Sequence, residues 1–479
     1  MPEKPSKTIG KQARFVLVKT GTLFTVPQKA FLIFGLIFGL FMLIANPPFM
    51  AMDENAHFTK AYSISEGHIL PVVKKGPGDY SKEKAVGYVV PKSLMSLLDR
   101  TKFWPPRPKK DAGDIISAFD ISLKSDVRVL KDYSIWAINM YSPLSYLPQA
   151  YGITIGRILG FSPLLIFYLG RFFNLLVFLA LVFFAIIVTP VHKWVFFLIG
   201  LLPVTINLAA SLSSDAMTIG LSLLAIAFFL RLALDDTKPV IEKRDKYLLF
   251  LLAAALALAK PPYFLLIFLF FMIPIRKFKS RKEYLAVFAL LLACVIIIAG
   301  FWSLLVAESY TARLPTVSPG KQVRFALDHP ASFVKAVART IYQSWQVWLG
   351  AFIGGLGWFN VSMPIWFVYL YLFVIIYVAT LDKGSQNIDW KQKAWILLII
   401  IVVFLAVFTQ SYFTWTPVGA TLIEGFQPRY LIPICPLFFL LFYNLKVRYT
   451  KSWFFYLLIS FFVVFSSTFT IYKIIVTLY

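Results

Sequence analysis

The stretch FLIFGLIFGLFMLIANPPFMAMDENAHF, residues 31–58, sets the class of this protein and marks its first polar feature. Residues 31–45 are almost entirely apolar and are followed by the prolines of NPP, residues 46–48. Proline lacks a backbone N–H and restricts the residue before it, so a helix is expected to end there. The adjacent carboxylates Asp53 and Glu54 follow a membrane-spanning helix, and we expect them to lie at a membrane surface.

The composition places the rest of the chain in a membrane as well. Of its 479 residues, 59% are hydrophobic and 15% are charged, and the mean hydropathy is +0.74. A soluble domain does not have this composition. Much of the Lys and Arg behind the net charge of +24 lies in short clusters between apolar runs. Such clusters orient the chain and contact anionic headgroups, so we expect membrane lipids and no nucleic acid as partners.

The apolar runs predict an all-α integral membrane protein. A hydrocarbon core of roughly 30 Å needs about 20 apolar residues per helix. This divides the chain into about eleven spans, at residues 30–46, 164–189, 194–210, 215–232, 247–259, 262–275, 284–304, 362–381, 394–410, 430–445 and 453–472. Cys294 and Cys435 both lie in these runs and are expected to be core residues.

The spans divide the chain into four parts. They are a cytoplasmic tail (1–29), the first transmembrane helix (30–46), a long extracytoplasmic loop (47–161) and a polytopic region (162–479). The loop ends in the amphipathic stretch NMYSPLSYLPQAYGITIGRILG, residues 139–160. This pattern predicts helices that lie in the membrane interface.

The charges of the loops predict the orientation. With the N-terminus inside, the cytoplasmic loops are basic or carry basic clusters, at residues 192–193, 238–246, 276–282, 381–393 and 446–452. This agrees with the positive-inside rule. The extracytoplasmic face then collects the acidic pair and the segments SLSSDA (211–216), LAKPPY (258–263), ESYTARLP (308–315) and WTPVGATLIEGFQPRY (415–430). We expect the functional site on that face.

Acids and cations on this face are the candidate site residues. Asp53 or Glu54 could accept a proton from an alcohol if burial raises its pKa toward the working pH. Alternatively, Asp53 caps the following helix and Glu54 favours the positive end of the helix dipole. Lys260 and Arg429 lie at the hydrocarbon edge, where they could hold a lipid phosphate or simply extend toward the headgroups.

Cofactor motifs are absent from the sequence. It contains no GxxxxGK[ST] loop, no GxGxxG after a strand, no HExxH and no CxxC. His57 lies four residues after Asp53 on the same helical face, and could share a divalent cation or a proton with it or form a surface hydrogen bond. We expect no cofactor other than an optional divalent cation. The glycines of AFIGGLGWF, residues 351–359, indicate helix packing or a re-entrant segment.

Several segments together resemble a known family. They are MDENAHF (52–58), YSPLSYLPQA (141–150), GRFFN (170–174), SLSSDA, AKPPY, IGGLGW (353–358) and WTP…GFQPRYLIP (415–433). Their order resembles the bacterial polytopic membrane family called domain of unknown function 2142. Where that family has Gly-Gln-Gly-Arg-Tyr, this chain has GFQPRY, residues 425–430.

That family is similar in plan to the GT-C superfamily of lipid-dependent glycosyltransferases. An acidic pair in the first external loop, a Pro-Leu element in an interface helix and an acid before the fourth span recur in GT-C enzymes. The pair Asp53 and Glu54, the dipeptide at 143–144 and Asp215 match them here. The resemblance therefore implies a GT-C-like fold in a bacterial cytoplasmic membrane, with the site on the extracytoplasmic face.

The resemblance also implies an activity. An inverting glycosyltransferase would take a sugar from a polyprenyl-phosphate-linked donor and transfer it to a cell-envelope polysaccharide, teichoic acid or glycolipid. Asp53 would act as the general base, Glu54 or Asp215 would position the acceptor, and Lys260 and Arg429 would stabilise the leaving phosphate. Further substrate-binding residues are expected on the same face, at Arg313, Trp415, Gln427 and Tyr430, and Trp358 and Tyr263 could stack on sugars.

Two alternatives remain at this point. One is a transporter or flippase of a lipid-linked saccharide, for which ionisable residues near the midplane and internal repeats are typical. The other is a non-catalytic subunit of a polysaccharide assembly complex.

Overall fold

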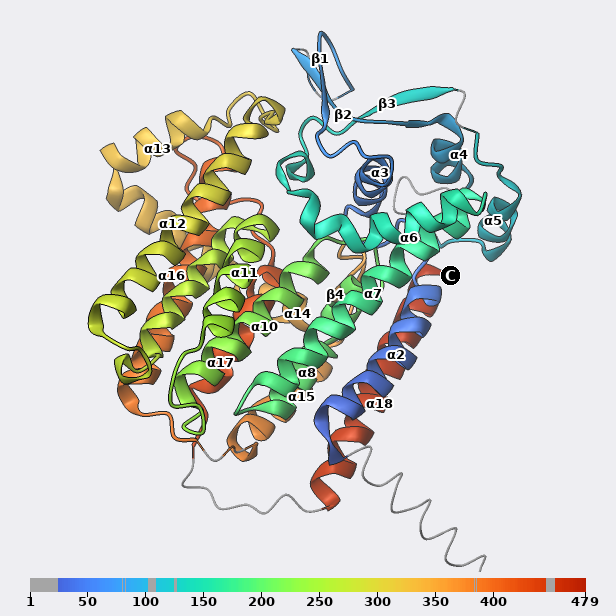
Figure 1. The fold of residues 1–479 in the computed structure, drawn as a ribbon. Coiled ribbons are helices and arrows are strands. Elements are labelled where there is room, and N and C mark those ends of the chain that lie inside the picture. Colours follow the sequence, from blue (N-terminus) through green and yellow to red (C-terminus); the bar gives the residue numbers. More distant parts are fainter. Residues whose placement is uncertain are drawn as a thin grey trace, which may run out of the picture.

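The computed structural model describes residues 25–79, 81, 83–101, 109–124, 127–382, 384, 386–444 and 453–479. The predicted cytoplasmic tail up to residue 24 and the predicted basic segment 446–452 lie outside the described residues. The chain forms a bundle of long helices with a cap of short helices and strands at one end (Figure 1).

Six described helices are long and apolar enough to cross a membrane. They are α2 (Pro27–Ala45), α7 (Pro163–Val188), α10 (Asp215–Leu234), α12 (Arg281–Leu305), α16 (Trp390–Thr414) and α18 (Trp453–Leu478). Shorter apolar elements are η4 (Pro261–Met272), α15 (Ile365–Leu381) and η7 (Pro428–Ile434) with α17 (Cys435–Leu440). The helical membrane class is therefore confirmed, whereas the number of eleven spans stays a prediction.

Two of the predicted spans have a different local structure. The segment 194–210 is divided into α8 (Lys193–Gly200) and α9 (Pro203–Ala209), because Pro203 cannot continue the hydrogen bonding of α8. The pair predicted on either side of Lys260 consists of α11 (Lys243–Ala259) and the 3-10 element η4. The next turn, η5 (Ile275–Lys277), leads into α12.

The segment 47–161 adds a small sheet to the otherwise helical fold. Besides α3 (Glu54–Ser65), α4 (Lys92–Arg100), α5 (Ala112–Ser117) and η1 (Ala118–Asp120), it contains a three-stranded antiparallel sheet. The strands are β1 (Val72–Lys75), β2 (Lys84–Pro91) and β3 (Arg128–Asp132), with Gly87 opposite Asp132. The VGYVV sequence of β2 is rich in residues that favour strands. The sheet needs glycine at position 87, because a Cβ there would collide with the backbone of Lys131.

The predicted interfacial stretch is helical. It forms η2 (Ala137–Met140), η3 (Pro143–Tyr146) and α6 (Leu147–Ile158). Figure 1 shows α6 running across the end of the bundle beside α7, with the sheet farther out.

The segment between α12 and α15 is more structured than the spans suggested. It contains η6 (Ala307–Ser309), α13 (Pro319–Asp328), α14 (Pro330–Gly354) and the hairpin of β4 (Gly355–Leu356) and β5 (Val361–Ser362). Basic and polar residues such as Lys335, Arg339 and Gln343 interrupt α14, so it fails a search for apolar runs. In the hairpin turn, Trp358 Nε1 donates a hydrogen bond to the Phe49 carbonyl at 3.3 Å. The glycine segment thus packs against the loop that precedes α3.

The centre of the bundle is α10, which is buried along nearly all of its length. Its first residue, Asp215, lies at the capped end of the bundle. At the opposite end, several of the basic loops contact one another. Lys393 donates to the carbonyls of Leu441 and Tyr443, and the Ile241 N–H donates to the carbonyl of Lys277. The two faces that the loop charges predicted are therefore separate ends of the molecule.

Candidate functional site

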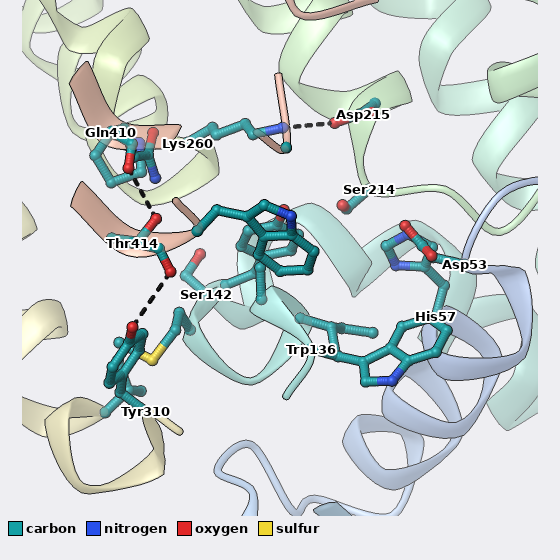
Figure 2. A pocket seen from close by; sticks show the side chains of 18 of the residues that line it. Asp53, His57, Trp136, Ser142, Ser214, Asp215, Lys260, Tyr310, Gln410 and Thr414 are labelled. Atoms are coloured by element: carbon teal, nitrogen blue, oxygen red, sulfur yellow. Dashed lines mark hydrogen bonds and ion pairs between the residues drawn. The ribbon is translucent and has the colours of Figure 1, made fainter. Parts of the chain in front are cut away.

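A cavity of about 1080 Å³ opens at the capped end, between the start of α3, the start of α10 and the junction of α11 with η4. Residues of η2, of the η6 loop and of the segment after α16 complete its wall. Figure 2 shows Asp53 and His57 on one side of this cavity and Tyr310 and Thr414 on the other. Nine of the predicted site residues line it: Asp53, His57, Asp215, Lys260, Arg313, Trp415, Gln427, Arg429 and Tyr430.

The backbone around Asp53 aims its carboxylate into the cavity. Asp53 precedes α3 with φ 60°, in the left-handed region, which Asp tolerates better than most residues. It occupies the N-cap position of α3, but its side chain accepts no cap hydrogen bond. Asp53 is therefore the N-cap by position, but its carboxylate does not cap α3.

Two cations and two carboxylates meet in the cavity wall. Lys260 Nζ lies 3.2 Å from Asp215 Oδ1, and Arg429 Nε lies 3.0 Å from Asp215 Oδ2. Arg429 Nη2 also lies 3.8 Å from Asp53 Oδ2. Lys260 Nζ contacts the face of the Tyr430 ring, 3.7 Å from its centroid. We call Asp53, Asp215, Lys260 and Arg429 the charge cluster.

Local sequence explains how these side chains are held. Two prolines follow Lys260, so α11 ends there and Lys260 is extended, with φ −162°. Asp215 begins α10, where the positive end of the helix dipole favours a carboxylate. The Tyr263 hydroxyl donates to the Tyr430 carbonyl at 2.6 Å, which fixes the segment carrying Arg429 to η4.

Burial and charge set the protonation of the residues near α3. Burial raises the pKa of Asp53 and the Asp215 charge adds to this, whereas Arg429 and Lys260 oppose it. The Asp53 side chain is still 31% exposed, so its carboxylate is accessible from the cavity. A carboxylate with a raised pKa can accept a proton near neutral pH.

His57 is a buried residue and not a surface one. Its Nδ1 forms a hydrogen bond with the Tyr146 hydroxyl at 2.8 Å, and burial lowers the pKa of His57 to about 3. The imidazole is therefore neutral at neutral pH. In the described part of the chain, no group of three or more His, Cys, Asp or Glu residues could hold a metal ion.

Glu54 lies outside the cavity, which corrects its predicted catalytic role. Its side chain is fully buried in a two-point ion pair with Arg171, with Nε–Oε1 at 2.8 Å and Nη2–Oε2 at 2.6 Å. The Leu212 N–H also donates to Glu54 Oε1 at 3.1 Å. We assign Glu54 a structural role, because its oxygens are occupied by protein donors.

Arg171 was not among the predicted site residues. Besides Glu54, its guanidinium donates to the carbonyls of Leu43, Asn46 and Pro47. It thereby joins the end of α2 and the NPP turn to α7, and it fixes the start of α3. The signal was present in GRFFN, since an arginine inside an apolar helix requires a counter-charge.

Aromatic residues form much of the remaining wall. Trp136 and Trp358 pack edge to face with their ring centroids 6.2 Å apart, and both line the cavity. The guanidinium carbon of Arg313 lies 5.1 Å from the ring centroid of Trp415. Trp136 belongs to the long segment before η2, where nothing in the sequence marked it as part of the site.

The chain matches one known protein family over most of its length. A family model described as "Predicted membrane protein (DUF2142)" matches residues 36–438. The chain belongs to the DUF2142 family. The predicted family resemblance is thereby confirmed, and the match includes every residue of the charge cluster. Comparisons with curated proteins and with solved structures gave no match.

This DUF2142 protein also has a second, apolar cavity of about 570 Å³ beside the first. Ser142, Leu258 and Trp302 line both cavities, so the two are adjacent. The other side chains of the apolar groove come from the segment between α3 and β1 and from η3, α6 and α12: Ile69, Pro143, Leu144, Leu147, Ile297, Ile298, Phe301 and Leu305. Phe301 is 67% exposed on a candidate membrane span, so the groove faces the membrane side of the bundle.

Two buried polar atoms of residues that line the cavity have no hydrogen-bond partner among the described residues. Arg429 Nε–H lies close to Asp215 but is not aligned for a hydrogen bond, and the buried Oε1 of Gln427 accepts none from any described residue. Buried polar atoms normally have partners. Because both atoms are buried, a ligand in the DUF2142 cavity would reach them only after a shift of these side chains.

Proposed function

We propose that this protein is an inverting glycosyltransferase of the GT-C type. It transfers a sugar from a polyprenyl-phosphate-linked donor to a hydroxyl of a cell-envelope polysaccharide, teichoic acid or glycolipid. The reaction takes place at the extracytoplasmic face of a bacterial cytoplasmic membrane. The observation that carries this proposal is the charge cluster in the wall of a cavity that adjoins an apolar groove.

The two cavities together support a lipid-linked donor. In the proposal, the phosphate lies beside Lys260 and Arg429, and the isoprenoid chain leaves through the groove between η3 and α12. Arg429 binds phosphate oxygens as a two-point fork, and Lys260 contributes a point charge. A free nucleotide-sugar would have no use for the apolar groove.

The proposed chemistry is a single displacement. Asp53 accepts the proton of the acceptor hydroxyl while its oxygen forms a bond to the anomeric carbon. The bond from that carbon to the phosphate oxygen breaks, and polyprenyl phosphate leaves with the electron pair. Lys260 and Arg429 stabilise the charge that grows on this phosphate, a form of electrostatic catalysis that is worth most in enclosed sites.

The wall of the cavity supports the remaining assignments. Trp415 and Trp358 offer ring faces or edges to sugars, while Asp215, Gln427 and Arg313 offer polar atoms to hydroxyls. Tyr263, predicted to stack on a sugar, is only 1% exposed and instead supports the wall from behind. The cavity residues all come from the capped end of the bundle. A one-sided cavity favours an enzyme over a transporter or flippase, and a transfer assay separates the enzyme from a non-catalytic subunit.

Replacing Arg429 tests the phosphate assignment. Arg429→Ala is expected to weaken binding of a polyprenyl-phosphate-sugar by about 10- to 100-fold, because a hydrogen bond to a charged group contributes roughly 1.5–3 kcal/mol. Arg429→Lys should recover only part of this, since the two-point fork is lost. Binding is measured in nanodiscs.

The controls decide between a phosphate role and simple extension toward the headgroups. Lys260→Ala should also weaken donor binding. Lys131→Ala removes a cation that lines the cavity outside the charge cluster, and it should have little effect. Unchanged affinity in both Arg429 variants and in Lys260→Ala would leave these cations only a structural role.

Labelling with a membrane-impermeant maleimide tests the proposed orientation. In a background in which Cys294 and Cys435 are replaced by Ala, Glu308→Cys near the cavity mouth should react in intact cells. Thr237→Cys, in the exposed loop between α10 and α11, should react only after permeabilisation. The reverse pattern would place the cavity at the cytoplasmic face and would contradict the proposed extracytoplasmic reaction.

A further inference from the structure

Arg429 is shared between two carboxylates that the fold brings from distant elements. Asp215 has two cationic neighbours, since Lys260 Nζ and Arg429 Nε both lie within 3.2 Å of its oxygens. Asp53 has a looser partner, Arg429 Nη2 at 3.8 Å, and this is its only ion pair with a residue that the structure describes. The counter-charge of Asp53 therefore depends on a group that also serves another acid.

The guanidinium is also free to change partners. A guanidinium has five N–H donors, and none of those of Arg429 forms an aligned hydrogen bond with Asp53 or Asp215. A phosphate that offers two oxygens in the plane of the fork would bind it better than the off-line carboxylates do. An anionic headgroup and Asp53 thus compete for Arg429.

We propose that Arg429 is the counter-ion of Asp53 in the free protein and pairs with an anionic headgroup when one binds. Headgroup binding and protonation of Asp53 are then coupled. This inference rests on the proposed function, because the headgroup is that of the donor. It adds a second role to Arg429, which tunes the base as well as holding the phosphate.

The charges that face Asp53 give the direction of the coupling. Arg429 from η7 and Lys260 from the α11–η4 junction oppose protonation, while Asp215 from α10 favours it. His57 from α3 is neutral, since burial lowers its pKa to about 3. A bound anion adds negative charge and engages both cations, so the pKa of Asp53 must rise further. The carboxylate is then a stronger base when the donor is present.

The sign of the pH dependence follows from linkage. The complex with the anion holds more protons than the free protein in the interval between the two pKa values of Asp53. By reciprocity, the affinity for the anion increases as pH falls through this interval. Above the interval the affinity reaches a lower, constant value, because Asp53 is ionised in both states.

Calorimetry with a singly charged probe measures this coupling. Geranyl methyl phosphodiester is a suitable probe, because its one acidic group stays ionised and takes up no proton itself. The full-length protein in nanodiscs is titrated at a series of pH values from about 4, the ordinary pKa of Asp, upward, in buffers of different ionisation enthalpy. Wild type should take up a fraction of a proton, approaching about one per bound anion, with tighter binding at lower pH.

Two variants identify the group that takes up the proton. Asp53→Asn should bind the diester with no proton uptake and little pH dependence. Asp99→Asn removes a carboxylate that lines the same cavity and has no ion pair among the described residues, and it should behave like wild type. Binding of the diester without proton uptake by wild type overturns the inference, as does uptake that persists in Asp53→Asn.

The outcome is separate from that of the transferase proposal. Proton uptake without any sugar transfer would contradict the enzyme and leave the coupling intact. Sugar transfer together with a pH-independent affinity for the diester would contradict the coupling and leave the enzyme proposal intact. Failure to bind the diester at all would contradict both the coupling and the phosphate site.

Discussion

Asp53→Asn is expected to lower the rate of the proposed sugar transfer by about 10²- to 10⁴-fold, the usual loss when a general base is removed. Asn has nearly the shape of Asp but accepts no proton, so donor binding and folding should change little. In wild type, kcat/KM should rise with pH through the raised pKa of Asp53, because only the ionised carboxylate is a base. The residual rate of the variant should lack this rise.

Transfer from a labelled polyprenyl-phosphate-sugar to envelope acceptors measures the effect. Asp99→Asn serves as the matched control, since Asp99 lines the same cavity away from the charge cluster. Turnover of Asp53→Asn within a few-fold of wild type would contradict its role as base. The base would then have to be Asp215, because Glu54 has no access to the cavity.

Glu54→Gln is expected to destabilise the protein by about 3–5 kcal/mol, the typical cost of leaving one charge of a buried pair without its partner. Both side chains of the Glu54–Arg171 pair are fully buried, so no solvent replaces the lost carboxylate. The stability is measured by titration with a denaturing detergent in micelles. The Glu54 carboxylate accepts hydrogen bonds from two N–H groups of Arg171 and from the Leu212 N–H. The neutral amide of Gln lacks the negative charge that strengthens these bonds.

A matched control compares the loss of this buried ion pair with the loss of an exposed one. Asp236→Asn breaks a pair with Arg276 in which both side chains are at least 70% exposed, and it should cost about 0–1 kcal/mol. Adding Arg171→Met to Glu54→Gln should recover part of the loss, because the unpaired charge is then absent. Equal stability of Glu54→Gln and Asp236→Asn would contradict a structural role for the pair.

Much of the site could be predicted because it depends on local properties. An apolar run followed by two prolines fixed where α2 ends, and loop charges separated the two ends of the bundle. Asp53, Asp215, Lys260 and Arg429 were expected on one face for that reason, and one cavity contains them all. The sheet and α14 were missed, because α14 carries too many polar residues for a hydropathy search and strand pairing depends on distant partners.

The sequence alone was sufficient for the membrane class, for the family and for the face that carries the charges, since these follow from composition and from short-range order. It could not distinguish the two neighbours Asp53 and Glu54, which have the same chemistry one residue apart. Their roles depend on a left-handed backbone at Asp53 and on Arg171, which lies 117 positions from Glu54. A desolvated arginine in α7 requires a carboxylate, and only the packing of α2 and α3 against that helix determines which of the two acids it takes.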